Sequence, residues 1–175
     1  MIPFIGPHTD IMGPDMGTNE QVMAWFMDTY SAYRGISVPE IVTGKPVSVG
    51  GTAGRRESTG RGVVYLIERA ANLMKMKLSG GKAVIQGFGN VGAVIPDILC
   101  NAGGVIVSYF EWIQSLQSLF WNETEVVDRL FRVLETSFSA VIKRSREEKI
   151  PHRFAAMAIG VERVMRARKD RGLFP

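Results

Sequence analysis

The sequence predicts an α/β protein that is mostly helical and contains a small sheet. Within residues 82–92, the apolar run Ala83-Val84-Ile85 leads into glycines spaced G-x-G-x-x-G. This pattern is typical of a strand that passes into a helix whose N-terminus holds a pyrophosphate. Only 83 residues follow Gly92, and most have helical periodicity, whereas a complete dinucleotide domain needs several more strands and helices. We therefore expect a truncated, Rossmann-like dinucleotide-binding unit.

The composition is that of a soluble globular protein. The chain has 175 residues, of which 46% are hydrophobic and 22% are charged. Its single cysteine, Cys100, excludes an internal disulfide framework and fits a reducing compartment. The N-terminal residues lack a basic region and are interrupted by Pro3 and Pro7, so we expect neither a signal peptide nor a membrane span. The expected location is cytoplasmic.

Positive charge is concentrated near the C-terminus. Residues 143–171 carry ten Lys or Arg against four Asp or Glu, in a chain of net charge +4. A basic tail is one signature of nucleic-acid binding. Here acidic residues interrupt the run and Phe154 is the only aromatic residue, so no stacking platform for bases is predicted. We expect a solvated helical face, with neither nucleic acid nor a membrane as partner.

Apolar residues recur at helical spacing along much of the chain. Thr18 or Asn19 can cap the first helix and Gly35 can end it. The third segment has the clearest amphipathic pattern. The sequence predicts helices over four segments: 20–34, 63–78, 123–148 and 152–169.

Two other stretches have less regular patterns. Residues 36–62 contain two prolines, and five glycines lie between positions 50 and 62. They are predicted to form a long loop, and such a loop in a compact domain is usually functional. Residues 103–111 can form a second strand, since the three residues 105–107 favour extended structure. The same residues can instead open a helix that continues to Gln117.

The glycine loop is the first candidate site. Gly87 would allow a tight turn, Gly89 a close approach of the backbone to a pyrophosphate, and Gly92 tight packing of the helix. The alternative is a glycine-rich turn that binds no ligand. Glu111 lies about 20 residues further on, where a dinucleotide domain places an acid for the ribose. Alternatively, Glu111 is a surface residue on a helix, beside Trp112.

Two further segments carry candidate functional groups. Residues 50–62 combine three arginines and hydroxyl side chains with glycines at a predicted helix start. Such a loop can bind an anion through backbone N–H and guanidinium groups, or it can be a solvated capping loop. Asp15 lies in a rigid Pro/Gly loop, where a carboxylate can act as a general acid or base or can hold a turn. His8 and His152 are isolated from other ligand side chains, so no metal site is predicted.

Taken in chain order, these segments resemble the glutamate dehydrogenase family, within the wider group of Glu/Leu/Phe/Val dehydrogenases. The resemblance covers nearly the whole chain, and its specificity lies in the order of the motifs rather than in any one of them. The matching segments are GPDMGTN (13–19), MAWFMDTYS (23–31), VTGKP (42–46), GGTAGRRESTGRGV (50–63), GFGNVG (87–92) and PDILCNAGGVIVSYFEW (96–112).

This resemblance implies oxidative deamination of L-glutamate to 2-oxoglutarate with NAD or NADP, and the reverse amination. It implies that Asp15 is the catalytic aspartate, which handles protons at the amine. Ser108 would contact the side-chain carboxylate of the substrate. The residues implied along the cofactor are Arg55, Thr59, Gly87, Phe88, Gly89, Asn90, Val91, Gly92 and Asn101.

The resemblance also implies that parts of the family fold are missing. The family's substrate domain, with its glycine-flanked lysines, precedes the segment that begins at Ile2. The strands and helices that follow the family's glycine loop have no counterpart before Pro96. We therefore expect residues 1–50 to be a remnant of the substrate and oligomerisation domain, residues 51–112 a partial dinucleotide-binding domain, and residues 113–175 a set of C-terminal helices.

Two functions remain as hypotheses. One is an NAD(P)-dependent glutamate dehydrogenase. The other is an inactive remnant that acts only as a nucleotide-binding or assembly module, because hydride transfer requires closely aligned reactants. The family places residues 103–114 on a helix, so Glu111 would not be the ribose acid and the choice of NAD or NADP cannot be read. A sheet with few neighbours would expose apolar surface, so we expect association or aggregation. The resemblance implies a homo-oligomer, although much of what builds the family's oligomers is missing here.

Overall fold

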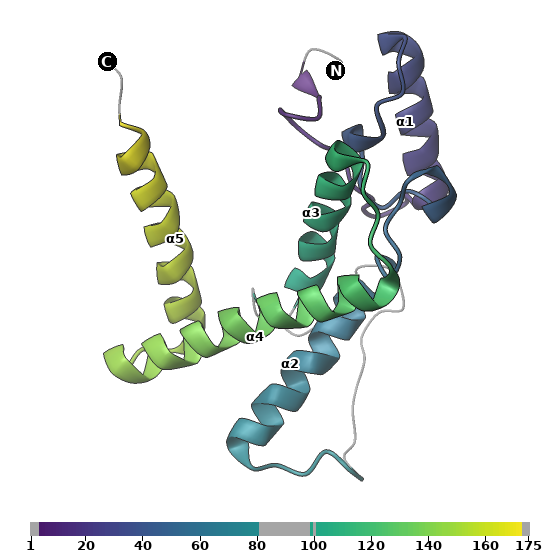
Figure 1. The fold of residues 1–175 in the computed structure, drawn as a ribbon. Helices are drawn as coiled ribbons and strands as arrows, with labels where there is room; N and C mark the ends of the chain where they lie inside the picture. Colours follow the sequence, from purple (N-terminus) through teal and green to yellow (C-terminus); the bar gives the residue numbers. More distant parts are fainter. Residues whose placement is uncertain (1–3, 81–98, 100, 173–175) are drawn as a thin grey trace.

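The computed structural model describes residues 4–80, 99 and 101–172. The predicted strand before Gly87, the glycine loop of residues 87–92 and Pro96 lie outside the described residues. No helix that the structure describes has the length and apolar character needed to cross a bilayer. The described elements are α1 (Glu20–Arg34), η2 (Pro39–Ile41), η3 (Val47–Val49), α2 (Ser58–Met74), α3 (Ala102–Gln117), α4 (Glu123–Glu148) and α5 (His152–Arg171) (Figure 1).

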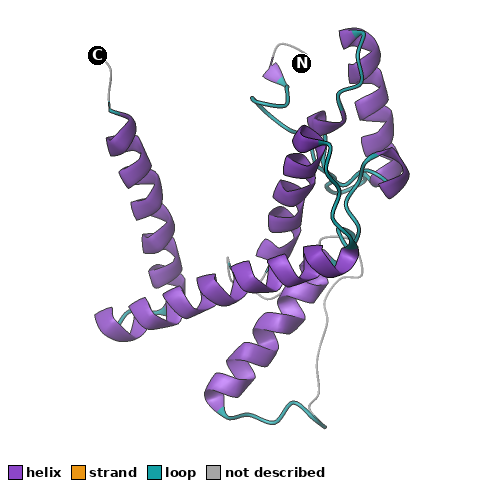
Figure 2. Cartoon of the chain, in the orientation of Figure 1, coloured by secondary structure: helices purple, strands orange, loops and turns teal. Residues whose placement is uncertain are grey.

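The small sheet is not formed by the residues that the structure describes. Figure 2 shows helices joined by loops, and pairing of the β type within residues 4–80, 99 and 101–172 is limited to one isolated parallel bridge between Met12 and Val42. Of the two alternatives for residues 103–111, the strand is wrong and the helix that continues to Gln117 is confirmed, because these residues lie inside α3, which ends at Gln117. Val107 is fully buried and Phe110, one helical turn later, is nearly so. Packing of this helical face therefore outweighs the extended preference of β-branched residues.

The helix boundaries agree with the sequence where capping signals are strong. Asn19 caps α1 by accepting a hydrogen bond from the Val22 N–H at 3.1 Å, and Gly35 ends the helix in the left-handed conformation, with φ of 70°. Helix α4 spans the predicted residues and begins with a capping box between Asn122 and Glu125. The last helix starts at the predicted residue and extends slightly past its predicted end.

Helix α2 departs from the prediction at both ends. It begins at Ser58 rather than 63, since its first turn contains glycines that lower its apparent helix propensity. It ends at Met74, where Lys75 adopts a left-handed conformation, so Leu78 lies beyond the helix. The helical spacing of apolar residues predicts one buried stripe along this segment, and that prediction is wrong in part: Met74 is 67% exposed, whereas Leu66, which is not in the stripe, is only 3% exposed and faces the core. The stripe comprises Val63, Ile67, Ala70, Met74 and Leu78.

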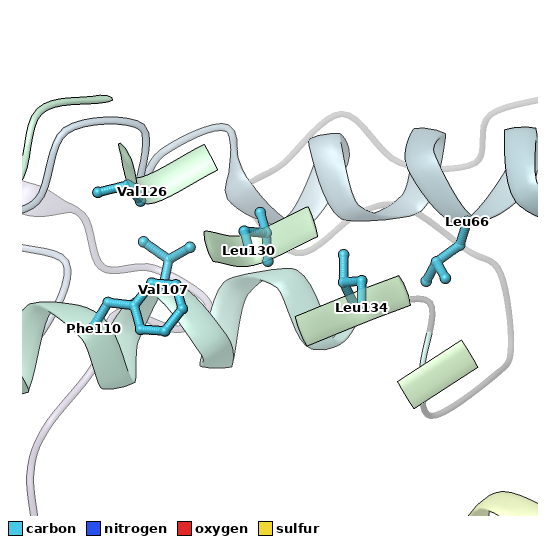
Figure 3. Packing of buried hydrophobic residues seen from close by; sticks show 6 residues of the cluster. All are labelled: Leu66, Val107, Phe110, Val126, Leu130 and Leu134. Atoms are coloured by element: carbon cyan, nitrogen blue, oxygen red, sulfur yellow. The ribbon is translucent and has the colours of Figure 1, made fainter. Parts of the chain in front are cut away.

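The main hydrophobic core lies between α2, α3 and α4. Helix α4 crosses the other two, and each of the three helices contacts both others. Figure 3 shows how their side chains meet, with residues of α4 between those of α2 and α3. The buried members are Leu66, Val107, Phe110, Val126, Leu130 and Leu134.

A second, smaller core packs beneath α1. It contains Met23 and Tyr30 of α1 together with Val38, Ile41 and Val42 of the following segment. This segment also contacts α3 through η2. Helix α3 therefore borders both cores and sets the position of the N-terminal segment relative to α2 and α4.

The N-terminal turns of α2 and α3 approach closely through two glycines. A Cβ placed on Gly62 would lie 3.2 Å from the Cα of Gly103, and a Cβ on Gly103 would lie 2.2 Å from the backbone oxygen of Ser58. Such short distances to main-chain atoms cannot be relieved by a side-chain rotation. Glycine at 103 is therefore required for this helix contact.

We expect Gly103→Ala to lower the free energy of unfolding by about 1–3 kcal/mol, because the added methyl group pushes α3 away from α2. Urea denaturation of both proteins measures the difference. Gly160→Ala is the matched control, since Gly160 lies in α5 with open space around its Cα. There the substitution should stabilise the helix. Equal stability of Gly103→Ala and the original chain would contradict the assigned helix contact.

Candidate functional site

A pocket of about 670 Å³ opens where the N-terminal ends of α1, α2 and α3 meet. Its walls come from segments that are far apart in the sequence. Helix α1 and the loop before it supply one side, and the first turns of α2 and α3 supply the others. The structure brings five of the residues proposed from the sequence to this pocket: Asp15, Arg55, Thr59, Asn101 and Ser108. The other proposed residues, 87–92, lie outside the described residues.

Asp15 lies at the rim of the pocket in a tight turn. Its backbone oxygen accepts hydrogen bonds from the N–H of Thr18 at 3.0 Å and from the Thr18 hydroxyl at 2.8 Å. Its side-chain Oδ1 accepts a hydrogen bond from the N–H of Met16 at 2.8 Å. The side chain is exposed, and no hydrogen bond to its Oδ2 is formed within the described part of the chain. Asp15 is thus a turn aspartate with one oxygen available to the pocket.

Arg55 and Ser108 line the pocket on the side formed by α2 and α3, and they contact each other. The Nε–H of Arg55, before α2, donates a hydrogen bond to the Ser108 hydroxyl on α3 at 2.9 Å. Burial lowers the pKa of the Arg55 guanidinium, while the charges of Glu111 and Glu20 oppose that shift. The group keeps its charge at neutral pH, because the ordinary pKa of arginine is far above it. Within the described residues Arg55 has no ion-pair partner, so its charge is available to an anion.

The first turns of α2 and α3 add positive potential to the same pocket. Neither helix has a side-chain cap: Glu57 and Asn101 occupy the capping positions without the capping hydrogen bond. Unpaired N–H groups at helix starts carry partial positive charge and attract anions. Thr59 lies so close to Gly104 that a Cβ there would come within 2.5 Å of its hydroxyl. A larger residue at 104 would therefore displace the Thr59 hydroxyl at the pocket wall.

The arginine-rich segment of residues 50–62, predicted as a loop, runs into α2 from Ser58, and its arginines lie in two places. Arg55 and Arg56 line the pocket, in agreement with an anion-binding loop. Arg61 instead pairs with Glu123 at the start of α4, at 2.6 Å. The hydroxyl of Ser58 is also internal, because it donates a hydrogen bond to the Arg55 backbone oxygen at 2.7 Å. This last bond shapes the turn that carries Arg55.

Glu111 is buried, so its interpretation as a surface residue is wrong. It lies on α3, and its carboxylate is inaccessible to solvent, as is the ammonium of Lys45, which it meets at 2.8 Å. The same carboxylate accepts hydrogen bonds from the N–H groups of Gly44 at 3.0 Å and Lys45 at 3.4 Å. The Lys45 ammonium also donates to the Val42 backbone oxygen and the Ser115 hydroxyl, both at 3.2 Å.

The sequence interpretation missed Lys45 and its role. The available signal was a lysine within the Val-Thr-Gly-Lys-Pro motif, three residues after the apolar pair Ile41-Val42, where a charged residue is buried only if it is paired. Glu111 was interpreted as a surface residue because the family resemblance placed it on a helix, away from the position of a ribose acid. Pairing between positions 66 residues apart leaves no pattern in a single sequence.

The Lys45–Glu111 pair positions Asp15 through a short series of contacts. Gly44, held by Glu111, has φ of 75°, and a Cβ there would lie 2.7 Å from the ring of Pro14. Close by, the N–H of Thr43 donates a hydrogen bond to the Met12 backbone oxygen at 2.8 Å. The loop that carries Asp15 is therefore pressed against a segment anchored on α3, the helix that also bears Ser108.

We expect Glu111→Gln to lower the free energy of unfolding by about 3–5 kcal/mol, because it leaves the buried Lys45 ammonium without its counter-charge. Chemical denaturation followed by circular dichroism measures the loss. Glu147→Gln is the matched control, since the Lys143–Glu147 pair is 75% and 63% exposed and the change should have little effect. Equal effects of the two substitutions would show that the Lys45–Glu111 pair does not hold the segment.

Two family models match the chain. The model described as Glutamate/Leucine/Phenylalanine/Valine dehydrogenase matches residues 50–95 and 93–172. The model described as Glu/Leu/Phe/Val dehydrogenase, dimerisation domain, matches residues 1–32. The first model matches in two pieces that meet at residues 93–95, next to the position where the sequence predicts that an internal part of the family fold is missing.

Curated relatives show the same pattern. An NAD-specific glutamate dehydrogenase of Staphylococcus aureus (strain COL) is 30% identical over 278 residues, covering 97% of this chain and 67% of the relative. A glutamate dehydrogenase of Thermotoga maritima is 29% identical over 283 residues, covering 98% of this chain and 68% of the relative. Both alignments extend over more residues than this chain contains, so the relatives carry internal sequence without a counterpart here.

Solved structures agree with this assignment. The hetero-hexameric glutamate dehydrogenase from Thermus thermophilus, in its Leu-bound form, has a TM-score of 0.93 at 25% identity, covering 99% of this chain and 67% of that one. Glutamate dehydrogenase from Peptoniphilus asaccharolyticus, at 24% identity, supports the fold with a TM-score of 0.86, covering 99% and 68% of the two chains. Together with the family-model matches, these comparisons show that the chain belongs to the Glu/Leu/Phe/Val dehydrogenase family.

Proposed function

We propose that the pocket binds glutamate and 2-oxoglutarate and is the active site of an NAD(P)-dependent glutamate dehydrogenase. The observation that carries the proposal is the meeting of Asp15, Arg55 and Ser108 at one pocket, although they come from three separate segments. The names of the relatives specify glutamate as the substrate of those proteins. The charge of Arg55 and the uncapped helix starts favour an anionic ligand such as a dicarboxylate.

The side chains have complementary roles in this proposal. Ser108 accepts a hydrogen bond from Arg55, so its own O–H remains able to donate to a substrate carboxylate. Asp15 anchors its turn through Oδ1 and keeps Oδ2 for a proton at the substrate amine. An aspartate in this position can act as a general acid or base. Arg55 fixes the orientation of Ser108 and supplies the positive charge next to it.

The described residues also fit the family's cofactor at the same pocket. Arg55, Thr59 and Asn101 present polar groups beside the uncapped starts of α2 and α3, a donor set suited to amide and phosphate groups. When bound, NAD or NADP supplies the two-electron oxidant of the reaction. The residues proposed for cofactor and for substrate meet at the Arg55–Ser108 hydrogen bond, as catalysis by close alignment requires.

A second candidate is a nucleotide-binding or assembly module without turnover. The internal sequence that the relatives carry and this chain lacks favours this candidate, because part of the cofactor-binding surface could go with it. In either case we propose a cytoplasmic homo-oligomer. The match of residues 1–32 to the family's dimerisation domain supports association.

We expect Ser108→Ala to weaken binding of 2-oxoglutarate by about 10- to 100-fold, the effect of losing one hydrogen bond to a charged group. Isothermal titration calorimetry on the purified chain measures it, and binding of NADH should change little. Arg132→Met, an exposed position on α4, removes a charge away from the pocket and should leave both affinities unchanged. Unaltered 2-oxoglutarate binding in Ser108→Ala would place the substrate elsewhere.

We expect Asp15→Asn to retain 2-oxoglutarate binding and to lose about 100-fold or more in turnover, because the amide cannot exchange the proton. The assay follows NADH absorbance during amination of 2-oxoglutarate, with calorimetry on the same preparation. Ligand binding by the unmodified chain without turnover would favour the second candidate. Full turnover by Asp15→Asn would remove Asp15 from the proposed mechanism.

A further inference from the structure

Gln114 is a buried amide near the end of α3 that does not line the pocket. Its Nε2 donates hydrogen bonds to the Thr52 hydroxyl at 2.8 Å and to the Phe110 backbone oxygen at 3.3 Å. Its Oε1 accepts a hydrogen bond from the Trp121 N–H at 2.6 Å. Both N–H groups and the oxygen of this amide therefore have partners, and two of the partners belong to segments outside α3.

The chemistry of these partners fixes which way round the amide lies. The backbone N–H of Trp121 can only donate a hydrogen bond, so the amide oxygen of Gln114 must face it. The amide nitrogen then faces Thr52, whose hydroxyl is able to accept. The bond between Gln114 and Thr52 thus follows from the position of both side chains and is not one of two equivalent arrangements.

Thr52 begins the turn that carries Arg55. The N–H of Arg55 donates a hydrogen bond to the Thr52 backbone oxygen at 3.2 Å, which closes a four-residue turn. On the other side, the Arg55 backbone oxygen accepts the hydrogen bond from the Ser58 hydroxyl at the start of α2. A displacement of Thr52 therefore moves the backbone of Arg55 with it.

Helix α3 holds this turn at two points. The first is the hydrogen bond from Arg55 to Ser108, and the second is the bond from Gln114 to Thr52. Within the part of the chain that the structure describes, these two hydrogen bonds join residues 50–57 to α3. Ser108 and Gln114 lie six residues apart, which is roughly 9 Å along the helix axis. Two separated attachments fix both the place and the direction of the turn, whereas one would let it pivot.

We propose that Gln114 is a positioning residue for the pocket: through Thr52 it keeps the Arg55 guanidinium against Ser108, where a substrate carboxylate binds. The proposal rests on the proposed function for the identity of that substrate. Gln114 acts through Arg55, because its own side chain does not reach the pocket. A binding group that is already ordered loses less freedom when the ligand arrives. The apparent affinity falls in proportion to the fraction of chains that hold the competent arrangement.

The first test observes Arg55 without any ligand. Thr52→Val keeps the size of the side chain and removes the hydroxyl that Gln114 binds. It should raise the rate at which the Arg55 Nε proton exchanges with water by about 3-fold or more, measured by NMR on the full chain. Thr52→Ser keeps the hydroxyl and should leave the rate close to that of the original chain. An unchanged rate in Thr52→Val, or the same increase in both variants, would overturn the proposal.

The same measurement on Gln114→Met approaches the contact from the other partner. Methionine has a similar length and cannot donate to Thr52, so exchange of the Arg55 Nε proton should accelerate as it does in Thr52→Val. Gln114→Met should also lose more stability, because the Trp121 N–H loses its partner as well. A folded Gln114→Met chain in which Arg55 exchanges at the original rate would contradict the positioning role.

The second test separates positioning from general stability by calorimetric titration with 2-oxoglutarate. Thr52→Val should weaken binding by about 3- to 10-fold, the effect of one neutral hydrogen bond. Tyr65→Phe is the matched control, since it removes a hydroxyl hydrogen bond to Glu135, 2.7 Å long, from residues that do not line the pocket. It should lower the stability in urea by a similar amount and leave the affinity unchanged. Unchanged affinity in Thr52→Val, or equal losses in the two variants, would overturn the proposal.

The two tests also distinguish a failure of this proposal from a failure of the proposed function. If the unmodified chain does not bind 2-oxoglutarate, the proposed function fails, and the exchange of the Arg55 Nε proton still decides whether Gln114 positions it. If the chain binds 2-oxoglutarate and Thr52→Val changes neither the exchange rate nor the affinity, the proposed function stands and the positioning role fails. The expected result is faster exchange and weaker binding in Thr52→Val, with neither change in Thr52→Ser.

Discussion

The buried ion pair between Lys45 and Glu111 is the interaction on which the arrangement of the pocket depends. Both charged groups are inaccessible to solvent, and each has further hydrogen-bond partners that offset the loss of hydration. The carboxylate on α3 holds the backbone of residues 44–45, and this backbone presses against Pro14, next to Asp15. The pair therefore fixes one relative position of two segments that a purely apolar contact would allow to slide. Its value lies in this choice of register more than in net stability.

Helix α3 connects the two walls of the pocket. Three residues on successive turns of α3 make different contacts. Gly103 permits close contact with α2, and Ser108 accepts a hydrogen bond from Arg55. Glu111 binds Lys45 in the segment that packs against the Asp15 loop. The core side chains Val107 and Phe110 lie between these positions and fix the rotation of the helix against α2 and α4. A small change in the rotation of α3 would thus move the Ser108 hydroxyl relative to Asp15, the two groups that we propose for substrate binding and for proton transfer. Chemistry that needs close alignment is sensitive to such a change.

The sequence predicted the features that depend on local signals. Asn19, Gly35 and the periodicity of residues 123–148 define α1 and α4 because capping and amphipathic spacing are encoded within a few residues. Five of the proposed site residues lie at one pocket. They could be named from the sequence because they belong to motifs whose order resembles a known family. Of the two alternatives for residues 103–111, the helix is confirmed and the strand is wrong, because Val107 packs into the core as part of α3, a tertiary effect. The burial of Glu111 was missed because its partner, Lys45, is distant in sequence.

The central claim is that Asp15, Arg55 and Ser108 form a binding site for a dicarboxylate substrate. A crystal structure of the full chain grown with saturating 2-oxoglutarate tests this claim most directly. The account predicts that the ligand lies in the pocket at the starts of α2 and α3, with one carboxylate within hydrogen-bond distance of the Ser108 hydroxyl. A well-ordered pocket without ligand, or 2-oxoglutarate bound at another surface, would contradict it.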